Sequence, residues 1–421
     1  MNMRISKPTF FEVSLVILII CACFLIDIGM QAPSWTFPYF SGAGHLVTQG
    51  QWLISKSDYS LFINLSDLER VWFDFAISQK AEDLVEYNYY GVGFLHVIAF
   101  AKLLFPFISP IAALVVLQVI IHCLICLAVI RNFRENRLKF FFIVFYALNP
   151  VVLKFVCFSF YYFWQVIPSF FLVLYFLHKK PWGAYLLPVA FILGVSLGVR
   201  GTTVLIVLLF LLLCVWRERS AISLISFGLV LGIKLFLYGS ETVPWHTVYV
   251  GIGGYENPHG VTLDDGAGFK LFEKKTGITI NTNPISGNFS DPELREHYGK
   301  VLKEEYFSIL KKSPSLLVSN AIKNTLGGYS VGYFVGNSSL QNMAITLGVG
   351  VALMLLSFRQ YFWFLAIGLS LISFTLFYPP IPAYMYGTYL ITVVAFLQML
   401  NPVYSKMRSA LFVFRSKSGN V

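Results

Sequence analysis

The chain has 421 residues, of which 57% are hydrophobic and only 12% are charged. Soluble domains carry about 25% charged residues, so this composition excludes an ordinary soluble protein and predicts an all-α polytopic membrane protein. The net charge of +10 does not indicate a nucleic-acid partner, because the basic residues lie in short segments beside apolar runs, where membrane proteins carry their orientation signals.

The first predicted element is a membrane-spanning helix over residues 11–30, preceded by the basic start MNMRISKPTF. No small-residue cleavage site follows, so we expect a retained helix rather than a cleaved signal peptide. A spanning helix needs about 20 apolar residues. Further segments that meet this requirement are 109–130, 140–160, 161–178, 182–200, 202–216, 220–238, 340–358, 361–377 and 384–400. The sequence therefore predicts about ten transmembrane helices.

Basic residues orient these spans. They occur at Arg4 and Lys7, in 131–139, 178–180 and 217–219, at Arg359, and in the C-terminal tail. With ten spans, all of them fall on one side, which the positive-inside rule identifies as the cytoplasm, and both termini lie there. An eleventh span at 90–107 would break this pattern, so we expect that segment to form a helix at the outer interface instead.

Three parts follow from this topology. Residues 1–238 form a membrane core, whose first outer loop (31–108) folds as amphipathic interfacial helices. Residues 239–339 form a large late outer region, and residues 340–421 hold the last spans and a basic cytoplasmic tail.

The late outer region has two segments with helical periodicity. DPELREHYGKVLKEEYFSILKK predicts a helix over 291–312, with Ser290 or Asp291 as its cap and Pro292 in its first turn. PSLLVSNAIKNTLGGY predicts a second amphipathic helix over 314–329, running toward the bilayer.

A glycine-rich stretch in the same region, YVGIGGYENPHGVTLDDGAG (249–268), would suggest a nucleotide-binding loop in a soluble protein. It lacks the Lys-Ser/Thr ending and the strand–helix context of a P-loop, and the predicted topology places it outside the cytoplasm. We therefore interpret it as a sugar- or acceptor-binding loop, with a plain surface turn as the alternative. Tight turns are expected at Gly251, Gly253 and Gly254, and hydroxyl-binding groups at Tyr255, Asp264 and Asp265.

The six cysteines all lie inside apolar runs, so none is placed to cross-link an exposed loop. Cys123 and Cys126 match C-x-x-C, but no second pair accompanies them, and we interpret them as packing residues rather than metal or redox groups. A divalent cation at Asp264 and Asp265 has no further ligands to support it, so no cofactor is expected.

Three basic residues interrupt the predicted spans, Lys154, Arg200 and Lys234, and Lys102 is expected at the same depth, near the outer face. A charge in hydrocarbon is costly and usually functional. Together these cations can hold a phosphate or pyrophosphate, for which the arginine fork is well suited. For each lysine the simpler alternative is snorkelling to the headgroups. Asp27, a carboxylate in the first span, is either a catalytic base or the partner of one of these cations.

Five local patterns, in this order and topology, resemble one known family. SGAGHLVTQGQW is similar to an A-x-x-L-x-x-G helix, EYNYYGVGFLHVIAFAKLLFP to an E-K-P-P…K-L-F-G segment, ALNPVVLKF to S-P-x-x-L, and LGVSLGVRGTTVLIVLL to G-L-x-x-x-x-R-x-x-x-L-L. VGIGGYENPHGVTLDDGAGF is similar to an outer segment of bacterial members. The layout resembles the GT-C glycosyltransferases, among them the dolichyl-phosphate-mannose mannosyltransferases and the arabinosyltransferases.

The resemblance implies a membrane enzyme, in a bacterial inner membrane, that transfers a sugar from a polyprenyl-phosphate carrier to a glycan, lipid or protein acceptor. Its phosphate would rest on Arg200 and the three lysines. A carboxylate would deprotonate the acceptor, and the candidates are Asp27, Asp58 and Glu86. Tyr384, at the start of the last span, would bind the sugar or acceptor together with Tyr255, Asp264 and Asp265.

The chain departs from the family pattern in places that bear on catalysis. PSWTFPYFSG lacks the family's early acid, Tyr87 and Asn88 replace the Lys and Pro of E-K-P, and YYFW (161–164) occupies the place of another acid. These departures leave the identity of the base open.

Other functional classes share some of these features. A polysaccharide polymerase of the O-antigen type would use the same kind of donor and transfer a whole oligosaccharide. A lipid-linked oligosaccharide flippase should have inverted repeats or broken helices with charges at the midplane, and we expect neither here. A membrane acyltransferase would need a buried His or an H-x-x-x-x-D motif, which the seven histidines do not provide.

Overall fold

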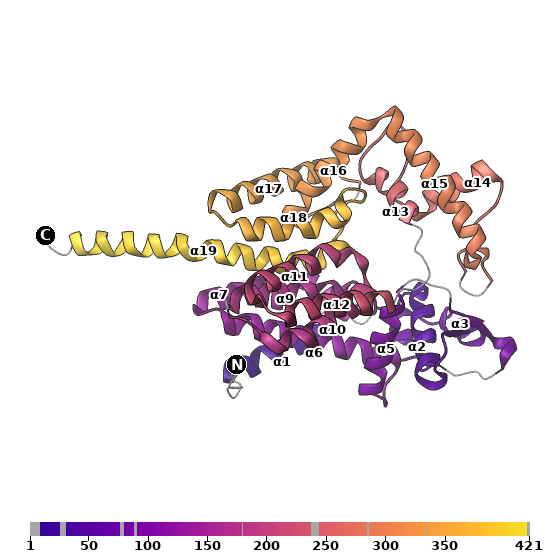
Figure 1. Ribbon diagram of the computed structural model, residues 1–421, viewed down its shortest axis with the longest axis horizontal. Helices are drawn as coiled ribbons and strands as arrows, with labels where there is room; N and C mark the ends of the chain where they lie inside the picture. The colour runs from indigo at the N-terminus through magenta and orange to yellow at the C-terminus, as the bar shows by residue number, and fades with distance from the viewer. Residues whose placement is uncertain are drawn as a thin grey trace.

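A computed structural model describes residues 9–25, 31–75, 80–87, 91–178, 180–236, 244–283, 286–334 and 336–418. Asp27 and Asn88 lie outside these ranges. The described chain is mostly helical, with one short two-stranded antiparallel sheet. Its helices form an elongated bundle with two outer bodies at one end (Figure 1).

Each predicted span contains a helix. The bundle consists of α1 (Phe10–Leu25), α6 (Pro110–Asn132), α7 (Asn136–Phe142), α8 (Pro150–Cys157), α9 (Val166–His178), α10 (Leu186–Val199), α11 (Val204–Glu218), α12 (Ala221–Phe236), α17 (Ser338–Ser357), α18 (Tyr361–Thr375) and α19 (Pro382–Ser418). Four stretches within the described residues are long and apolar enough to cross a membrane: 110–132, 201–218, 338–357 and 382–400. A bent pair, 136–147 with 150–157, makes up to five, and the other apolar helices are 10–17 residues long. The chain therefore has the helices of a multi-pass membrane protein.

The predicted continuous helix over 140–160 is wrong, because the chain bends by 53° between α7 and α8. A π-helical turn, Ile143–Ala147, ends the first half. Pro150 cannot donate a backbone hydrogen bond, and the Asn149 side chain caps α8 by accepting from the N–H of Val151 at 2.9 Å. The His122 ring nitrogen Nε2 lies 3.1 Å from the carbonyl oxygen of Ala147, which the break leaves without a helical partner. The expectation that the spans are unbroken is corrected here.

The first outer body contains α2 (Phe37–Gln49), α3 (Lys56–Phe62), α4 (Asp67–Val71) and α5 (Val92–Leu104), together with the antiparallel strands β1 (Leu53–Ser55) and β2 (Leu84–Glu86). Phe37, Phe40, Phe62 and Phe94 are fully buried in its core. The Asp83 carboxylate accepts from the N–H of Ser57 at 2.8 Å and ties β2 to the start of α3. This body is a packed unit rather than a linker.

The late outer body contains α13 (Pro244–Val250), α14 (Asp265–Thr276), α15 (Pro292–Lys312) and α16 (Pro314–Tyr329). The two helices predicted here are confirmed. The Asp291 carboxylate caps α15 by accepting from the N–H of Glu293 at 3.0 Å, and Pro292 is the first helical residue. Tyr298 and Phe272 are fully buried between α14 and α15.

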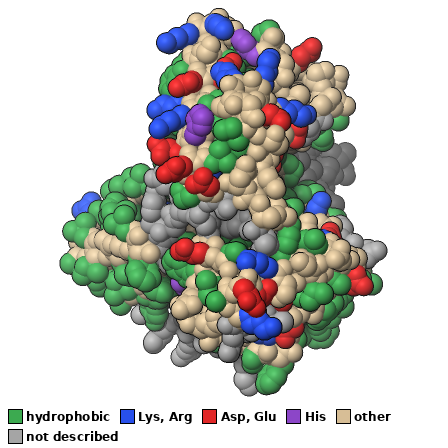
Figure 2. Space-filling view, turned by 90° about the vertical axis from the view of Figure 1, so that its right-hand side faces the viewer, with side chains coloured by type: hydrophobic (Ala, Val, Ile, Leu, Met, Phe, Trp, Pro, Cys, Tyr) green, Lys and Arg blue, Asp and Glu red, His purple; other side chains and the backbone are tan. Residues whose placement is uncertain are grey.

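Both outer bodies lie at one end of the bundle, whereas α7 and the far end of α19 lie at the other (Figure 1). Viewed from the outer end, charged side chains gather on the two bodies, and a flank beside them is covered with hydrophobic side chains (Figure 2). Charged caps and apolar flanks are the distribution that a membrane-embedded bundle requires.

An ion pair fixes α1 to α6 at the end opposite the outer bodies. The two carboxylate oxygens of Glu12 accept from Arg131 Nε at 2.7 Å and Nη2 at 3.0 Å. Glu12 also lies in the first predicted span, and its side chain is only 10% exposed. Bidentate pairing compensates for its burial.

We expect a double-mutant cycle on this pair to give a coupling free energy of about 1–3 kcal/mol, because each single change leaves a partly buried charge alone. The measurement is unfolding of Glu12→Ala, Arg131→Ala and the double variant in detergent. The control is Lys300 with Glu296 on α15, 2.8 Å apart and 66% and 70% exposed. Its coupling should stay below about 0.5 kcal/mol, and equal couplings would contradict the prediction.

Candidate functional site

Arg200 occupies a single-residue break between two bundle helices. Its backbone is extended, with φ −152°, and its N–H donates to the Ser196 carbonyl at 2.9 Å to close α10. Residues Gly201–Thr203 form a short 3₁₀ turn that leads into α11. The break turns the Arg200 side chain out of the regular helical pattern.

Three tyrosine rings surround the guanidinium group. Its central carbon lies 4.2 Å from the ring centroid of Tyr384, 4.7 Å from that of Tyr161 and 5.2 Å from that of Tyr162. We call these four residues the Arg200 cage. Ring faces attract a cation and partly replace its lost hydration.

The guanidinium group retains an unused donor. Arg200 is 8% exposed, and its Nε donates to the Thr202 hydroxyl at 3.2 Å. Its Nη1 is buried and has no hydrogen-bond partner among the described residues. A buried donor of this kind is costly unless it is satisfied, and a charged oxygen is its strongest partner. The cage therefore has the chemistry of an anion site.

Gln165 holds the two halves of the cage together. Its side-chain amide donates to the carbonyl of Tyr162 at 3.2 Å and to that of Ala383, next to Tyr384, at 2.6 Å. Gly387 permits this approach, because a Cβ there would lie 2.4 Å from the Gln165 carbonyl oxygen. The first turn of α19 is thereby fixed against the start of α9.

The first outer body reaches the cage through α5. A Cβ on Gly93 would lie 2.4 Å from the Gly198 carbonyl carbon, two residues before Arg200. The rings of Tyr39 and Phe94 lie 6.4 and 6.0 Å from that of Tyr161. An aromatic layer therefore joins this body to one side of the cage.

The late outer body reaches the cage through the loop between α18 and α19. The Tyr378 ring lies 5.1 Å from that of Tyr384. Burial raises the pKa of Tyr378, and the nearby phenols of Tyr384, Tyr162 and Tyr333 and the carboxylate of Asp265 add to this rise. Tyr378 therefore stands between the cage and the late outer body.

The glycine-rich stretch packs on this loop. Gly251–Gly254 form a short 3₁₀ turn, as the sequence predicts, and the glycines also permit close approach to neighbouring backbone. A Cβ on Gly251 would lie 1.9 Å from the Phe377 carbonyl oxygen, and one on Gly253 would lie 2.2 Å from the Thr262 carbonyl carbon. Neither glycine has a positive φ. The Tyr333 hydroxyl donates to the Gly254 carbonyl at 2.6 Å and fixes the stretch further.

The polar residues predicted in this stretch have separate surroundings. The Tyr255 ring lies under the Lys323 ammonium, 5.2 Å from its centroid. Asp264 caps α14 by accepting from the Gly266 N–H at 3.1 Å. Asp265 accepts from His246 Nε2 at 3.2 Å, and this contact lowers the pKa of Asp265.

Of the predicted phosphate ligands, Arg200 alone lies in the cage. The Lys102 ammonium donates to the carbonyl of Ile108 at 2.7 Å and pairs with Asp74 at 3.4 Å. Lys154 is exposed on α8, and Lys234 is half-buried on α12. The described contacts of Lys102 lie outside the cage, whereas Tyr384, predicted as a sugar or acceptor residue, is the ring closest to the guanidinium group.

The predicted bases are dispersed. Asp58 is 1% exposed, inside the first outer body, and Glu86 is exposed at the end of β2. Asp27 lies outside the described residues. From the sequence, Tyr161 and Tyr162 were noted only as replacements for an acid, and their place beside Arg200 was not predicted. Tyr378 was also missed, although an aromatic residue before two prolines could have indicated a fixed loop there.

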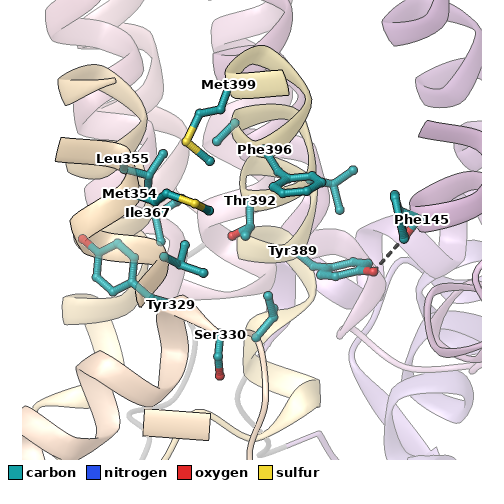
Figure 3. A pocket seen from close by; sticks show the side chains of 14 residues that line it. Phe145, Tyr329, Ser330, Met354, Leu355, Ile367, Tyr389, Thr392, Phe396 and Met399 are labelled. Carbon is teal, nitrogen blue, oxygen red and sulfur yellow. Dashed lines mark hydrogen bonds between the residues drawn. The ribbon is translucent and has the colours of Figure 1, made fainter. Parts of the chain in front are cut away.

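An apolar groove lies further along α19. Its cavity volume is 280 Å³, and its walls come from α16 to α19 and from Phe145 of the π-helical turn (Figure 3). Met354, Leu355, Phe396 and Met399 line it, and the Tyr389 hydroxyl at one edge donates to the Phe145 carbonyl at 2.8 Å. Its lining suits a hydrocarbon chain.

The described residues contain no group of three or more His, Cys, Asp or Glu side chains that could hold a metal ion. No protein-family model, curated protein or solved structure matches the chain.

We expect Gly387→Ala to destabilise the bundle by about 1–3 kcal/mol, because the added methyl group must displace the Gln165 backbone. The measurement is thermal unfolding in detergent. Gly232→Ala in α12 is the matched control, since a Cβ there meets nothing within 4 Å and alanine favours a helix. Equal unfolding temperatures for the two variants would show that α19 does not pack as described.

Proposed function

We propose that the chain is a membrane glycosyltransferase of the GT-C type, which transfers a sugar from a polyprenyl-phosphate carrier to a glycan, lipid or protein acceptor at the outer face. The observation that carries this proposal is the Arg200 cage with its unused buried donor. A phosphate ester is the anion that such a planar donor binds best.

The proposal includes ten spans with both termini in the cytoplasm of a bacterial inner membrane. The basic segments 131–139 and 217–219 then lie inside, and both outer bodies lie outside. The arrangement of the bundle, with both bodies at one end, supports this orientation.

In the proposed reaction the donor phosphate accepts hydrogen bonds from Arg200. As the acceptor oxygen attacks the anomeric carbon, the bond from that carbon to the phosphate oxygen breaks, and negative charge grows on the leaving phosphate. A fixed guanidinium in a water-poor site stabilises this charge. In this proposal Tyr161 and Tyr384 also contact the sugar, and a single displacement inverts the anomeric centre.

The apolar groove along α19 is the proposed place for the polyprenyl chain. It is lined by side chains such as Leu355, Ile367 and Val393, and burying a hydrocarbon chain there is favourable by about 25 cal/mol per Å². The groove is lined in part by α19, the helix that carries Tyr384. One lipid can therefore place its hydrocarbon chain in the groove and its phosphate near the cage.

The transporter alternative is favoured by one observation, the 53° break between α7 and α8, since broken helices are typical of transporters. A polymerase would use the same anion site with an oligosaccharide donor. Assaying the chemistry itself separates these classes, because a flippase leaves the bond between sugar and phosphate intact.

We expect the purified protein in liposomes to release polyprenyl phosphate from one of a panel of radiolabelled polyprenyl-phosphate sugars, given with an envelope lipid and glycan extract as acceptor. Arg200→Ala should lower the rate about a hundredfold or more, and Arg200→Lys should restore little, because a lysine cannot reproduce the fork.

Arg134→Ala, at an exposed arginine beyond the inner end of α6, is the matched control and should keep the wild-type rate. Equal loss in both variants would remove Arg200 from the site. No release from any monosaccharide donor would favour the polymerase, if oligosaccharide donors react, or the flippase, if the donors cross the bilayer unchanged.

Orientation has its own test. A cysteine placed at Lys274, exposed in the late outer body, should react with a membrane-impermeant maleimide in intact cells. A cysteine at Arg134 should react only after permeabilisation. The reverse pattern, with the unsubstituted chain as background, would invert the proposed topology.

A further inference from the structure

A hydrogen-bonded chain of three side chains crosses the late outer body. The Tyr298 hydroxyl lies 2.6 Å from His246 Nδ1, and His246 Nε2 lies 3.2 Å from an Asp265 carboxylate oxygen. Tyr298 is fully buried, whereas the Asp265 side chain is 82% exposed. These three hydrogen-bonded side chains therefore connect the core of the late outer body to its surface.

The buried end sets the direction of the hydrogen bonds. Burial raises the pKa of Tyr298, so its hydroxyl keeps its proton. Since His246 is its one described partner, that proton is donated to Nδ1. The proton of a neutral His246 ring then lies on Nε2 and points to Asp265. Phe269, whose ring is 5.3 Å from the His246 ring and nearly parallel to it, holds the imidazole in plane.

Gly268 leaves room for the hydrogen bond between Tyr298 and His246, because it has no side chain. A Cβ there would lie 2.5 Å from the Tyr298 hydroxyl and 3.1 Å from His246 Nδ1. Asp265 is also the first residue of α14, where a carboxylate is favoured by the helix dipole. The Asp265 carboxylate is therefore ionised and oriented by its contact with His246, and the rest of its side chain is exposed to solvent.

Tyr378 packs against the core of the late outer body, which includes Tyr298. The charge of Asp265 acts on the Tyr378 phenol, and the Tyr378 ring contacts Tyr384, the closest ring to the guanidinium. The late outer body therefore presents an oriented base next to the loop that carries the anion site.

We propose that Asp265 is the general base that activates the acceptor hydroxyl, and that His246 and Tyr298 are positioning residues for it. This inference rests on the proposed glycosyl transfer. The acceptor oxygen forms a bond to the anomeric carbon, its proton passes to Asp265, and the bond from carbon to phosphate oxygen breaks, with the electron pair leaving on the polyprenyl phosphate.

Three other carboxylates singled out in the sequence fit this role less well. Asp58 is enclosed in the first outer body, and Glu86 is exposed at the end of β2, where no described hydrogen bond orients its carboxylate. Asp264 is used as a helix cap. A base must lie within hydrogen-bond reach of the acceptor, and Asp265 combines exposure, orientation and proximity to the cage loop.

Azide gives a direct test, because it is a nucleophile that has no proton to lose. Asp265→Ala should release polyprenyl phosphate from the reactive polyprenyl-phosphate sugar at least about a hundredfold more slowly than wild type. Added sodium azide should restore release and yield the glycosyl azide. Asp265→Asn should be slow as well, and Arg200→Ala should not respond to azide.

Each result decides a separate point. Wild-type rates in Asp265→Ala, or slow release that azide does not restore, would overturn the assignment of the base while Arg200-dependent release keeps the proposed function. Absence of release by the wild type with every donor, azide included, would overturn the glycosyl transfer itself and the base with it.

The positioning residues have a different signature. Tyr298→Phe and His246→Ala should lower kcat with little change in the KM for the donor, and azide should bypass both defects. His246→Gln, which keeps an N–H donor, should retain more activity than His246→Ala. Losses that azide leaves unchanged would show that these residues only support the fold.

Discussion

The structure depends on how one positive charge is buried. Arg200 is withdrawn from water in a break between two bundle helices, and its lost hydration is replaced by ring faces and a hydroxyl, joined in the proposed reaction by the donor phosphate. The rings come from the turn before α9 and from the start of α19, so those two segments must meet. Gln165 and Gly387 let them do so, and the outer bodies close on the same place through Gly93 and Gly251.

The need to give every buried polar group a partner also explains how a broken helix is tolerated in an apolar bundle. Backbone groups there need partners from the protein. Asn149 and His122 satisfy one end of α8, and at the other end the Gln118 amide donates to the carbonyls of Val156 and Phe158 at 2.9 and 3.0 Å. A short helix secured at both ends by side chains thus leads the chain into the turn that carries Tyr161 and Tyr162.

Local signals predicted local structure well. Composition and periodicity placed a helix in every predicted span, and Asp291 with Pro292 marked the start of α15 because a cap acts within one turn. The break at Asn149–Pro150 was missed, since a proline that starts a helix resembles one tolerated within it. Arg200 was found through the cost of its charge. Its tyrosines were not, because contacts between distant segments depend on packing that periodicity does not record.

The composition of the cage has a consequence for how the protein is made. Chains are synthesised and inserted from the N-terminus, so Arg200 and the two tyrosines of the turn before α9 are in place long before Tyr384, which belongs to α19. Until α19 arrives, the guanidinium lacks its nearest ring, and Gln165 lacks the Ala383 carbonyl. Insertion of α19 therefore completes the cage, and a chain truncated before α19 would carry an uncovered charge in the bundle.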